Sequence, residues 1–438
     1  MIAPIPLRNL PQSNIFRKGD VFVLFGELFG RGYANGLINE ARKAGMTIIG
    51  VTVGRRDENN ALRALTEDEL AIAEVNLGGR IINVPLMAGF DLDAPAGEPT
   101  PTDLLANMTL KSWQQDKLDW PHIEKCRTVG VKRFKDSVAQ VMATLDGMIP
   151  DGSNAFFAHT MAGGIPKVKV FLAIANRVYK GCGERFLSTR ALLDSDLGKL
   201  ILMNFDEVTA NTFQHLIEGS AAIRTRLEKT GGQVRYTAYG YHGTEILIDE
   251  QYQWQTYTSY TQGKAKMRLE HIAEAAWADG IKATVYNCPE IRTNSSDIFV
   301  GVELSLFPLL NALKKENGGA WAEAQWQACR ELFQEGHSLE QLLKKIADYN
   351  ASDVMKMFRD FAAWPMDNSA VLADLMIGTS DEITQMHKDR KVLVTDILSA
   401  LVLEGTGPLM FHETSAPSAP VLWLNHDIIA KQLNLMHG

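Results

Sequence analysis

A run of tyrosines and lysines in the second half of the chain could support acid–base or redox chemistry. It extends from Tyr239 to Ala275 and reads YGYHGTEILIDEQYQWQTYTSYTQGKAKMRLEHIAEA. A phenol, with a pKa of about 10, is a poor acid at neutral pH unless a nearby ammonium group favours its ionised form. A tyrosine followed closely by a lysine is therefore a candidate proton donor or oxyanion stabiliser.

The spacing of these residues allows three tyrosine–lysine pairs. Three residues separate Tyr260 from Lys264, six separate Tyr257 from Lys264, and eight separate Tyr257 from Lys266. The residues alone leave the choice among these pairs open.

A second candidate site is the glycine-rich segment in VFVLFGELFGRGYANGLINEARKAGMTIIGVTVGRRDE, which begins at Val21. Gly26, Gly30 and Gly32 lie between an apolar, β-prone run and a helical pattern that starts at Tyr33. We expect the first glycine to permit a tight turn, the second to let the backbone approach a pyrophosphate, and the third to allow close helix–strand packing. The helix N-terminus would offer its N–H groups to the phosphates, so the segment predicts a dinucleotide site.

Arginines near this loop predict which dinucleotide is bound. The second strand runs into Arg55 and Arg56, and Arg31 lies inside the glycine loop. Guanidinium groups suit a 2′-phosphate, whereas a carboxylate at this strand end suits free ribose hydroxyls. We therefore expect NADPH, with NADH possible because Asp57 follows.

The elements that must position these residues form an α/β pattern. Helical segments separate strand-like runs at Val21–Gly26, Met46–Val53, Arg80–Leu86, Asn154–His159, Gln233–Tyr239 and Ile281–Cys288. This order predicts a Rossmann-type doubly wound parallel sheet. We expect residues 1–318 to form the NAD(P)-binding core, with a helical insertion at about 165–230, and residues 319–438 to form a mostly helical C-terminal portion packed on it. The apolar run Phe299–Leu313 reads as a core helix.

Composition excludes several classes of function. The net charge of −8, with scattered basic residues, speaks against nucleic acid as a partner. The four cysteines are far apart and form no CxxC pair, which favours the cytoplasm, and the histidines show no metal-binding spacing. Asp396 and Glu303 interrupt the longest apolar runs, so no membrane span is expected. The sequence leaves a monomer or a homo-oligomer open.

The tyrosine–lysine stretch and the strand before it resemble the short-chain dehydrogenase/reductase superfamily. Three blocks, VRYTAYGYHG, YTSYTQGKAKMRLE and RTNSSDIFVGVELSLFPLLNALKKENG, further resemble the large trans-2-enoyl reductases that act on acyl-carrier-protein or CoA thioesters. The resemblance implies reduction of an enoyl-CoA or enoyl-acyl-carrier-protein double bond. It implies that Tyr257 bonds to or protonates the thioester oxygen and that Lys266 or Lys264 binds the nicotinamide ribose. It also implies that Tyr241 borders the acyl pocket.

The same resemblance implies further cofactor contacts. Thr293 with Ser295 or Ser296 would lie near the nicotinamide carboxamide or the phosphates, and His159 with Gly163 and Gly164 would pack against the adenosine and ribose. The sequence departs from the family pattern in the glycine loop, where Glu27 to Phe29 replace the usual serine, and at Gly54, where an acidic residue is usual.

Two other functions stay open at this point. One is a carbonyl reductase or hydroxyacyl dehydrogenase that uses Tyr260 and Lys264, with Thr244 in place of the usual serine. The other is an NADP-binding protein that has lost turnover.

Overall fold

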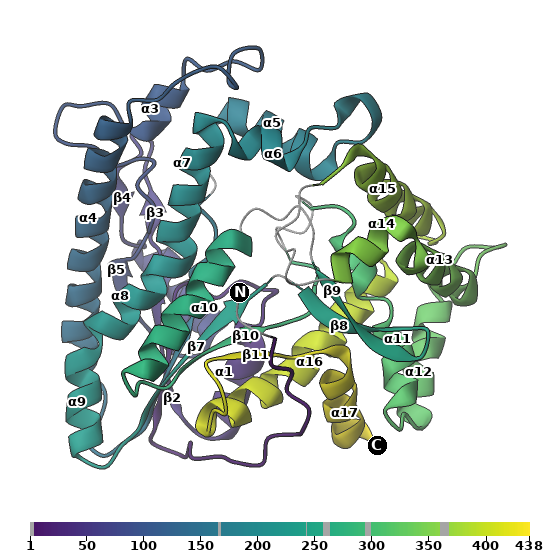
Figure 1. The fold of residues 1–438 in the computed structure, drawn as a ribbon. Helices are drawn as coiled ribbons and strands as arrows, with labels where there is room; N and C mark the ends of the chain where they lie inside the picture. Colours follow the sequence, from purple (N-terminus) through teal and green to yellow (C-terminus); the bar gives the residue numbers. More distant parts are fainter. Residues whose placement is uncertain (1–3, 165–167, 242, 257–262, 294–298, 360–367) are drawn as a thin grey trace.

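The computed structural model describes residues 4–164, 168–241, 243–256, 263–293, 299–359 and 368–438. Its centre is a seven-stranded parallel sheet with the order β11-β10-β7-β6-β1-β2-β5 (Figure 1). The strands are β1 (Val21–Phe25), β2 (Thr47–Thr52), β5 (Arg80–Pro85), β6 (Ala155–His159), β7 (Val234–Gly240), β10 (Ala283–Asn287) and β11 (Val421–Trp423). The chain winds outward in both directions from β1, so the predicted α/β, Rossmann-type fold class is confirmed.

All six predicted strands are present, with ends shifted by at most two residues. The sequence analysis missed β11, which residues 319–438 supply although we expected that portion to be mostly helical. It also missed two small hairpins, β3 (Arg55–Arg56) with β4 (Leu62–Arg63), and β8 (Gly243–Ile248) with β9 (Gln251–Thr256). Strands β3, β4 and β11 have two or three residues and are too short to show an alternating pattern. Strand β8 has six residues, but all of them are buried, so it shows no alternation either.

Apolar periodicity explains the first strand and the first helix. Every residue of β1 is buried, as expected for a parallel strand covered on both faces. In α1 (Ala34–Lys43) the buried residues are Ala34, Leu37, Ile38 and Ala41, which form one helical stripe. This stripe docks α1 against the sheet and fixes its N-terminus beside the end of β1.

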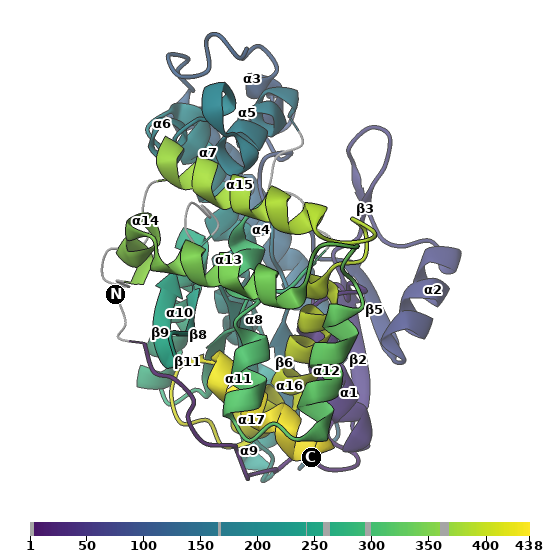
Figure 2. The ribbon, with the colours of Figure 1, turned by 90° about the vertical axis from the view of Figure 1, so that its right-hand side faces the viewer.

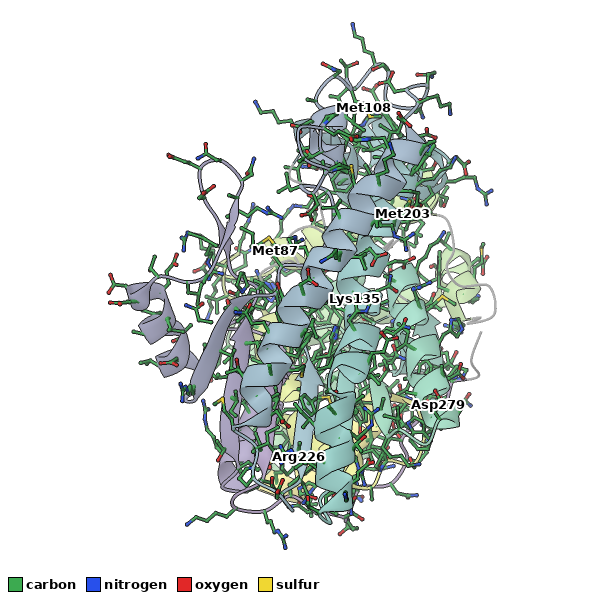
Figure 3. The ribbon with its side chains drawn as sticks, turned by 90° about the vertical axis from the view of Figure 1, so that its left-hand side faces the viewer. Met87, Met108, Lys135, Met203, Arg226 and Asp279 are labelled. Atoms are coloured by element: carbon green, nitrogen blue, oxygen red, sulfur yellow. The ribbon has the colours of Figure 1, made fainter. Side chains whose placement is uncertain are left out.

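Two layers of helices cover the sheet. On one face lie α1, α11 (Leu309–Lys315), α16 (Val394–Ser415) and α17 (His426–His437), packed around Phe22 and Phe156. On the other lie α4 (Trp120–Asp146), α8 (Thr212–Gly219), α9 (Ala221–Lys229) and α10 (Gly263–Ala278). Figure 3 views this second layer, with Lys135 on the exposed side of α4.

The remaining helices lie beyond these layers (Figure 2). Helices α3 (Pro101–Leu105), α5 (Lys169–Lys180), α6 (Thr189–Leu193) and α7 (Asp196–Phe205) share a separate apolar cluster with the start of α4. The others are α2 (Glu67–Leu77), α12 (Ala320–Arg330), α13 (Leu339–Ala351), α14 (Asp353–Lys356), α15 (Ala370–Gln385), the π-helical turn η2 (Asp206–Asn211) and the 3₁₀ turns η1 (Gly183–Arg185), η4 (Val302–Ser305) and η5 (Met357–Arg359).

The predicted helix over Phe299–Leu313 is wrong. The segment is broken into η4 and α11, with Pro308 as the N-cap of α11. Proline lacks the N–H that a continuous helix needs, and Gly301 adopts a left-handed φ of 99° that a helix does not use. The run therefore enters the core as two short helical segments, since Leu304 and Leu306 before the break are already buried there.

Helix α16 is long and apolar enough to cross a membrane by length and composition, although it contains Asp396. In the structure 72% of its most apolar 18-residue stretch is buried inside the protein. Such burial is typical of the core helix of a globular domain, and α16 packs against α1 and α17.

Helices α1 and α16 touch backbone to backbone at Gly36 and Gly407. We expect Gly36→Ala to lower the free energy of unfolding by about 1–3 kcal/mol, because the added Cβ would lie 2.8 Å from the Cα of Gly407. Urea unfolding measures this loss. Gly378→Ala in α15 is the matched control: its Cβ would meet nothing within 4 Å, so up to about 1 kcal/mol of stabilisation is expected. Stabilisation by both substitutions would contradict the close contact.

Candidate active site

A cavity opens where the carboxyl ends of β1, β6, β7 and β10 meet. In a doubly wound sheet this edge is where ligands bind, because the connections of β1 and β6 leave in opposite directions. Residues from the loops after all four strands line the cavity: Glu27, Leu28, Phe29, Gly32, Tyr33, Ala34, Asn35, His159, Thr160, Met161, Ala162, Tyr239, Gly240, Tyr241, Lys266, Glu290, Ile291, Thr293, Phe299 and Val302.

The glycine loop forms one side of this cavity. Gly26 has a φ of 129°, and a Cβ there would lie 2.4 Å from Thr160 Oγ1, so the tight turn requires glycine. A Cβ at Gly30 or Gly32 would meet nothing within 4 Å. The role expected for Gly32, close helix–strand packing, is therefore wrong; the close contact of this helix is at Gly36 instead.

The N-terminus of α1 fits a dinucleotide phosphate. No side chain of the described residues caps it, and its first turn contains no acidic residue. Asn35 donates from Nδ2 to the carbonyl oxygens of Phe29 and Gly32, at 2.9 and 3.0 Å, and so holds the loop. The space beside Gly30 and Gly32 leaves the backbone accessible to a ligand, as the phosphate of a dinucleotide requires.

Tyr33 connects two loops of the site. Its hydroxyl donates a hydrogen bond to the carbonyl oxygen of Pro289, beyond β10. Its ring stacks on that of Tyr239 at the end of β7, with centroids 5.9 Å apart. The hydroxyl of Tyr239 is buried and has no hydrogen-bond partner among the described residues. Tyr239 was not predicted as a site residue.

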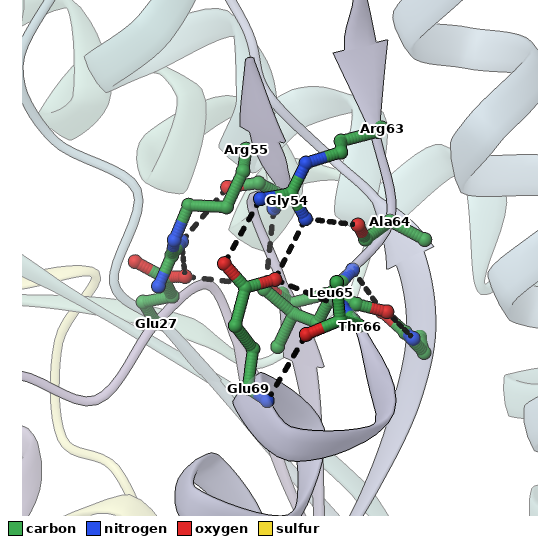
Figure 4. A network of polar contacts seen from close by, with 10 residues as sticks. Glu27, Gly54, Arg55, Arg63, Ala64, Leu65, Thr66 and Glu69 are labelled. Atoms are coloured by element: carbon green, nitrogen blue, oxygen red, sulfur yellow. Dashed lines mark hydrogen bonds and ion pairs between the residues drawn. The ribbon is translucent and has the colours of Figure 1, made fainter. Parts of the chain in front are cut away.

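A carboxylate, that of Glu27, lies beside the end of β2, where we expected arginines to bind the cofactor. Glu27 accepts a hydrogen bond from Thr52 Oγ1 at the end of β2, at 3.2 Å, and forms an ion pair with Arg55 (Figure 4). Arg63 instead pairs with Glu69 through two contacts of 2.6 and 2.9 Å. Glu27 lies in the glycine loop, two residues from the end of β1, and was noticed in the sequence only as a departure from the family pattern.

The structure does not bring Arg31, Arg55 and Arg56 together. Arg56 lies in the β3–β4 hairpin and donates to the carbonyl oxygen of Asn60 at 2.6 Å, and burial lowers its pKa. Arg31 lies 3.7 Å from Asp396 of α16. The hairpin turns the chain directly after β2, so each guanidinium group meets a different partner.

Lys266 is 8% exposed and lines the cavity from the first turn of α10. Its Nζ donates to the carbonyl oxygen of Tyr239 at 2.7 Å. Burial lowers the pKa of Lys266 to about 8, against the opposing effects of Cys288 and Glu270. Lys264 is half-buried and does not line the cavity. The candidate partners Tyr257 and Tyr260, and the cofactor candidate Ser295 with Ser296, lie outside the described residues.

His159 lines the cavity as a neutral residue. Its Nε2 lies 2.8 Å from Thr212 Oγ1, which itself donates to the carbonyl oxygen of Val208. The imidazole therefore carries its proton on Nε2, and burial lowers its pKa to about 3. Gly163 lies beyond the lining residues, where its carbonyl oxygen accepts from Thr209 at 3.3 Å.

The remaining candidates divide between the cavity and the core. Tyr241 and Thr293 line the cavity. Thr244, expected to replace the serine of a carbonyl reductase, is fully buried in β8 and donates to Asn425 Oδ1 at 2.8 Å. Within the described ranges, no three His, Cys, Asp or Glu side chains are grouped to hold a metal ion.

A doubly wound parallel sheet, an open helix N-terminus and a buried lysine at the switch point define an NAD(P)H-dependent oxidoreductase of the Rossmann type. Residues 3–433 match the family described as enoyl-acyl carrier protein reductase FabMG, and the chain belongs to this family. The enoyl reductase expected from the sequence is thus confirmed.

Two solved structures support this assignment. One, described as the apo structure of FabMG, a novel type of enoyl-acyl carrier protein reductase, has 86% sequence identity and a TM-score of 0.98, over 100% of this chain and 99% of that chain. Another, described as the NADH-bound structure of FabMG, has 73% identity and a TM-score of 0.82 over 100% of both chains. No protein of curated function matches the chain.

Because Lys266 is protonated in a buried site, we expect Lys266→Met to raise the free energy of unfolding of the cofactor-free protein by about 1–3 kcal/mol near pH 7. The lysine pKa is about 8 in the folded chain against 10.5 for an ordinary lysine. Between pH 8 and 10.5 the lysine is more often protonated in the unfolded chain than in the folded chain. The free energy of unfolding of the wild type therefore rises with pH in this range, and the stability difference between Lys266→Met and the wild type becomes smaller. Urea unfolding at several pH values measures the difference. A variant that is less stable at every pH would contradict this electrostatic cost.

Proposed function

We propose that this protein reduces the carbon–carbon double bond of a trans-2-enoyl group carried as a thioester on acyl carrier protein, with NADH as the preferred cofactor. The observation that carries the proposal is the burial of the Lys266 ammonium group in the cavity bordered by the glycine loop. The reaction belongs to fatty-acid synthesis, and we place it in the cytoplasm, where four free cysteines are expected to stay reduced.

In the proposed complex, the reduced nicotinamide supplies a hydride to the β-carbon of the enoyl group. The N–H groups at the start of α1 hold the cofactor phosphates, and Gly32 leaves the space that they need. Tyr241, Phe299 and Thr293 line the cavity. In this proposal Tyr241 and Phe299 would border the acyl group, and Thr293 would hold the nicotinamide carboxamide.

Charge develops on the thioester oxygen in the transition state, and the proposed role of Tyr257 is to hydrogen-bond or protonate this oxygen. Lys266 would bind the nicotinamide ribose, and its positive charge would make the phenol of Tyr257 a better proton donor by stabilising the phenolate that is left. The carbonyl oxygen of Tyr239 fixes the direction of the Lys266 ammonium group. Lys264 lacks such a position, which favours the Tyr257–Lys266 pair over the two pairs that contain Lys264.

The preference for NADH rests on Glu27. A carboxylate beside the end of β2 accepts hydrogen bonds from free ribose hydroxyls and repels a 2′-phosphate. Glu27 also neutralises Arg55, the arginine nearest to it. A 73% identical relative is described as NADH-bound. NADPH, expected from the three arginines, then becomes the weaker cofactor.

The function is tested by following NADH oxidation with a trans-2-enoyl-acyl carrier protein or an enoyl-CoA. Wild-type protein should turn over, and Lys266→Met should lower kcat by about 10²-fold or more, because the tyrosine at the developing oxyanion would lose the positive charge that assists its proton donation. Lys264→Met is the matched control and should stay within a few-fold of wild type.

The tyrosines complete this test. Tyr257→Phe should lose most of kcat while NADH still binds, and Tyr260→Phe should stay active. The opposite result would move the catalytic pair to Tyr260 and Lys264. Turnover of a 3-oxoacyl thioester without turnover of an enoyl thioester would show that the protein is a carbonyl reductase instead. NADH binding without either activity would show that it is an inactive cofactor-binding protein.

Removal of the Glu27 charge should change cofactor selectivity. We expect Glu27→Gln to raise the ratio of kcat/KM for NADPH to that for NADH by about tenfold, because Arg55 is freed for a phosphate and a repulsive carboxylate is lost. Nucleotide affinities from NADH and NADPH fluorescence should move in the same direction.

Glu69→Gln controls for the loss of an arginine partner in the same region. It removes the carboxylate from Arg63, which does not line the cavity, and should leave the cofactor ratio unchanged. An equal change of the ratio in both variants would remove Glu27 as the determinant.

A further inference from the structure

A second ionisable side chain of the cavity has no role in the function proposed above. Glu290 follows β10 by three residues, lines the cavity, and is only 5% exposed. Within the described ranges its carboxyl group accepts no hydrogen bond and has no basic partner closer than 4 Å. A nine-tenths buried carboxyl group is usually paired or bonded, so this exception calls for an explanation.

The carboxyl group of Glu303 interacts electrostatically with that of Glu290 and affects which of the two ionises. Glu303 in η4 accepts hydrogen bonds from Ser380 Oγ and, at 2.8 Å, from the backbone N–H of Gly301, and Arg292 acts on it as a positive charge. Two close carboxyl groups do not both ionise readily. Burial raises the pKa of Glu303 as well, but Glu303 has the hydrogen-bond donors. Glu303 is therefore the group of this pair that ionises first, and Glu290 is the one that keeps its proton.

Burial and the charge of Glu303 both raise the pKa of Glu290 well above its usual value. The other titratable groups that line the same cavity are Glu27, Tyr33, His159, Tyr239, Tyr241 and Lys266. A neutral carboxylic acid in such a site can donate a hydrogen bond or a proton at neutral pH.

We infer that Glu290 is the proton donor that completes reduction of the enoyl group. Addition of a hydride to the β-carbon leaves an enolate of the thioester. The O–H bond of Glu290 breaks, a new C–H bond forms at the α-carbon, and the electron pair stays on the carboxylate. Water at the cavity mouth then returns a proton to Glu290. Tyr257 keeps its proposed place at the thioester oxygen, so this inference rests on the proposed function.

Glu290→Gln tests the inference sharply, because glutamine keeps the shape, the neutrality and a hydrogen-bond donor but has no acidic proton. We expect kcat to fall by about 10²-fold or more, the usual size of acid catalysis, with NADH affinity unchanged by fluorescence titration. Glu413→Gln removes a carboxyl group of similar burial that does not line this cavity, and it should stay within a few-fold of wild type.

Infrared spectroscopy of the cofactor-free protein gives a readout independent of turnover. Wild type at neutral pH should show the band of a protonated carboxyl group, and this band should disappear in Glu290→Gln. If that variant does not fold, Glu290→Asp shifts the band and assigns it. A Glu290 that is ionised at neutral pH overturns the inference.

The outcomes separate the two proposals. A wild-type protein that turns over no enoyl thioester overturns the proposed function. An active wild type with an equally active Glu290→Gln variant overturns only the inference and leaves Glu290 as a neutral residue that fills the cavity wall.

Discussion

The close contact of β1 and β6 at their carboxyl ends determines where this protein can bind a ligand. Both strands are buried on both faces, so only their ends reach solvent. At Gly26 the backbone passes so near Thr160 that no side chain fits. The connection after β1 leads to α1 on one face of the sheet, and the connection after β6 leads to helices on the other face. The cavity lies between these two connections. Every proposed contact with cofactor or substrate depends on this geometry.

Burial also sets the chemistry of the cavity. It opposes charge on every ionisable group, and it acts with opposite sign on acids and bases. The pKa of Lys266 falls to about 8 and that of His159 to about 3, whereas that of Glu290 rises. The site therefore combines a neutral imidazole, a carboxyl group whose proton is held more tightly than usual, and an ammonium group that is held at some cost in stability. Proton transfer at neutral pH is easiest with groups whose pKa values move toward neutrality, as those of Lys266 and Glu290 do, whereas that of His159 moves away from it.

The glycine loop combines two tasks that Rossmann folds usually separate. The carboxylate for the ribose hydroxyls commonly follows the second strand. Here the strand ends at Thr52, and Gly54 leads into the β3–β4 hairpin. Glu27 from the first loop accepts a hydrogen bond from Thr52 and pairs with Arg55 (Figure 4). The proposed cofactor selectivity thus depends on a side chain of the same loop that leaves room for the phosphates, and a change in this loop would affect both.

Six of the seven sheet strands, the glycine turn and the candidate lysines could be predicted from the sequence, because apolar periodicity and glycine spacing are local properties of the chain. The sequence could not determine that Gly36 rather than Gly32 makes the close helix contact, because the partner, Gly407, is far along the chain. It could not show that Arg31, Arg55 and Arg56 find separate partners, or that Glu290 is buried beside Glu303. These points depend on the folded chain, because the charge state and reach of a side chain are set by neighbours from other elements. Those neighbours meet only when the sheet and both helix layers are packed together.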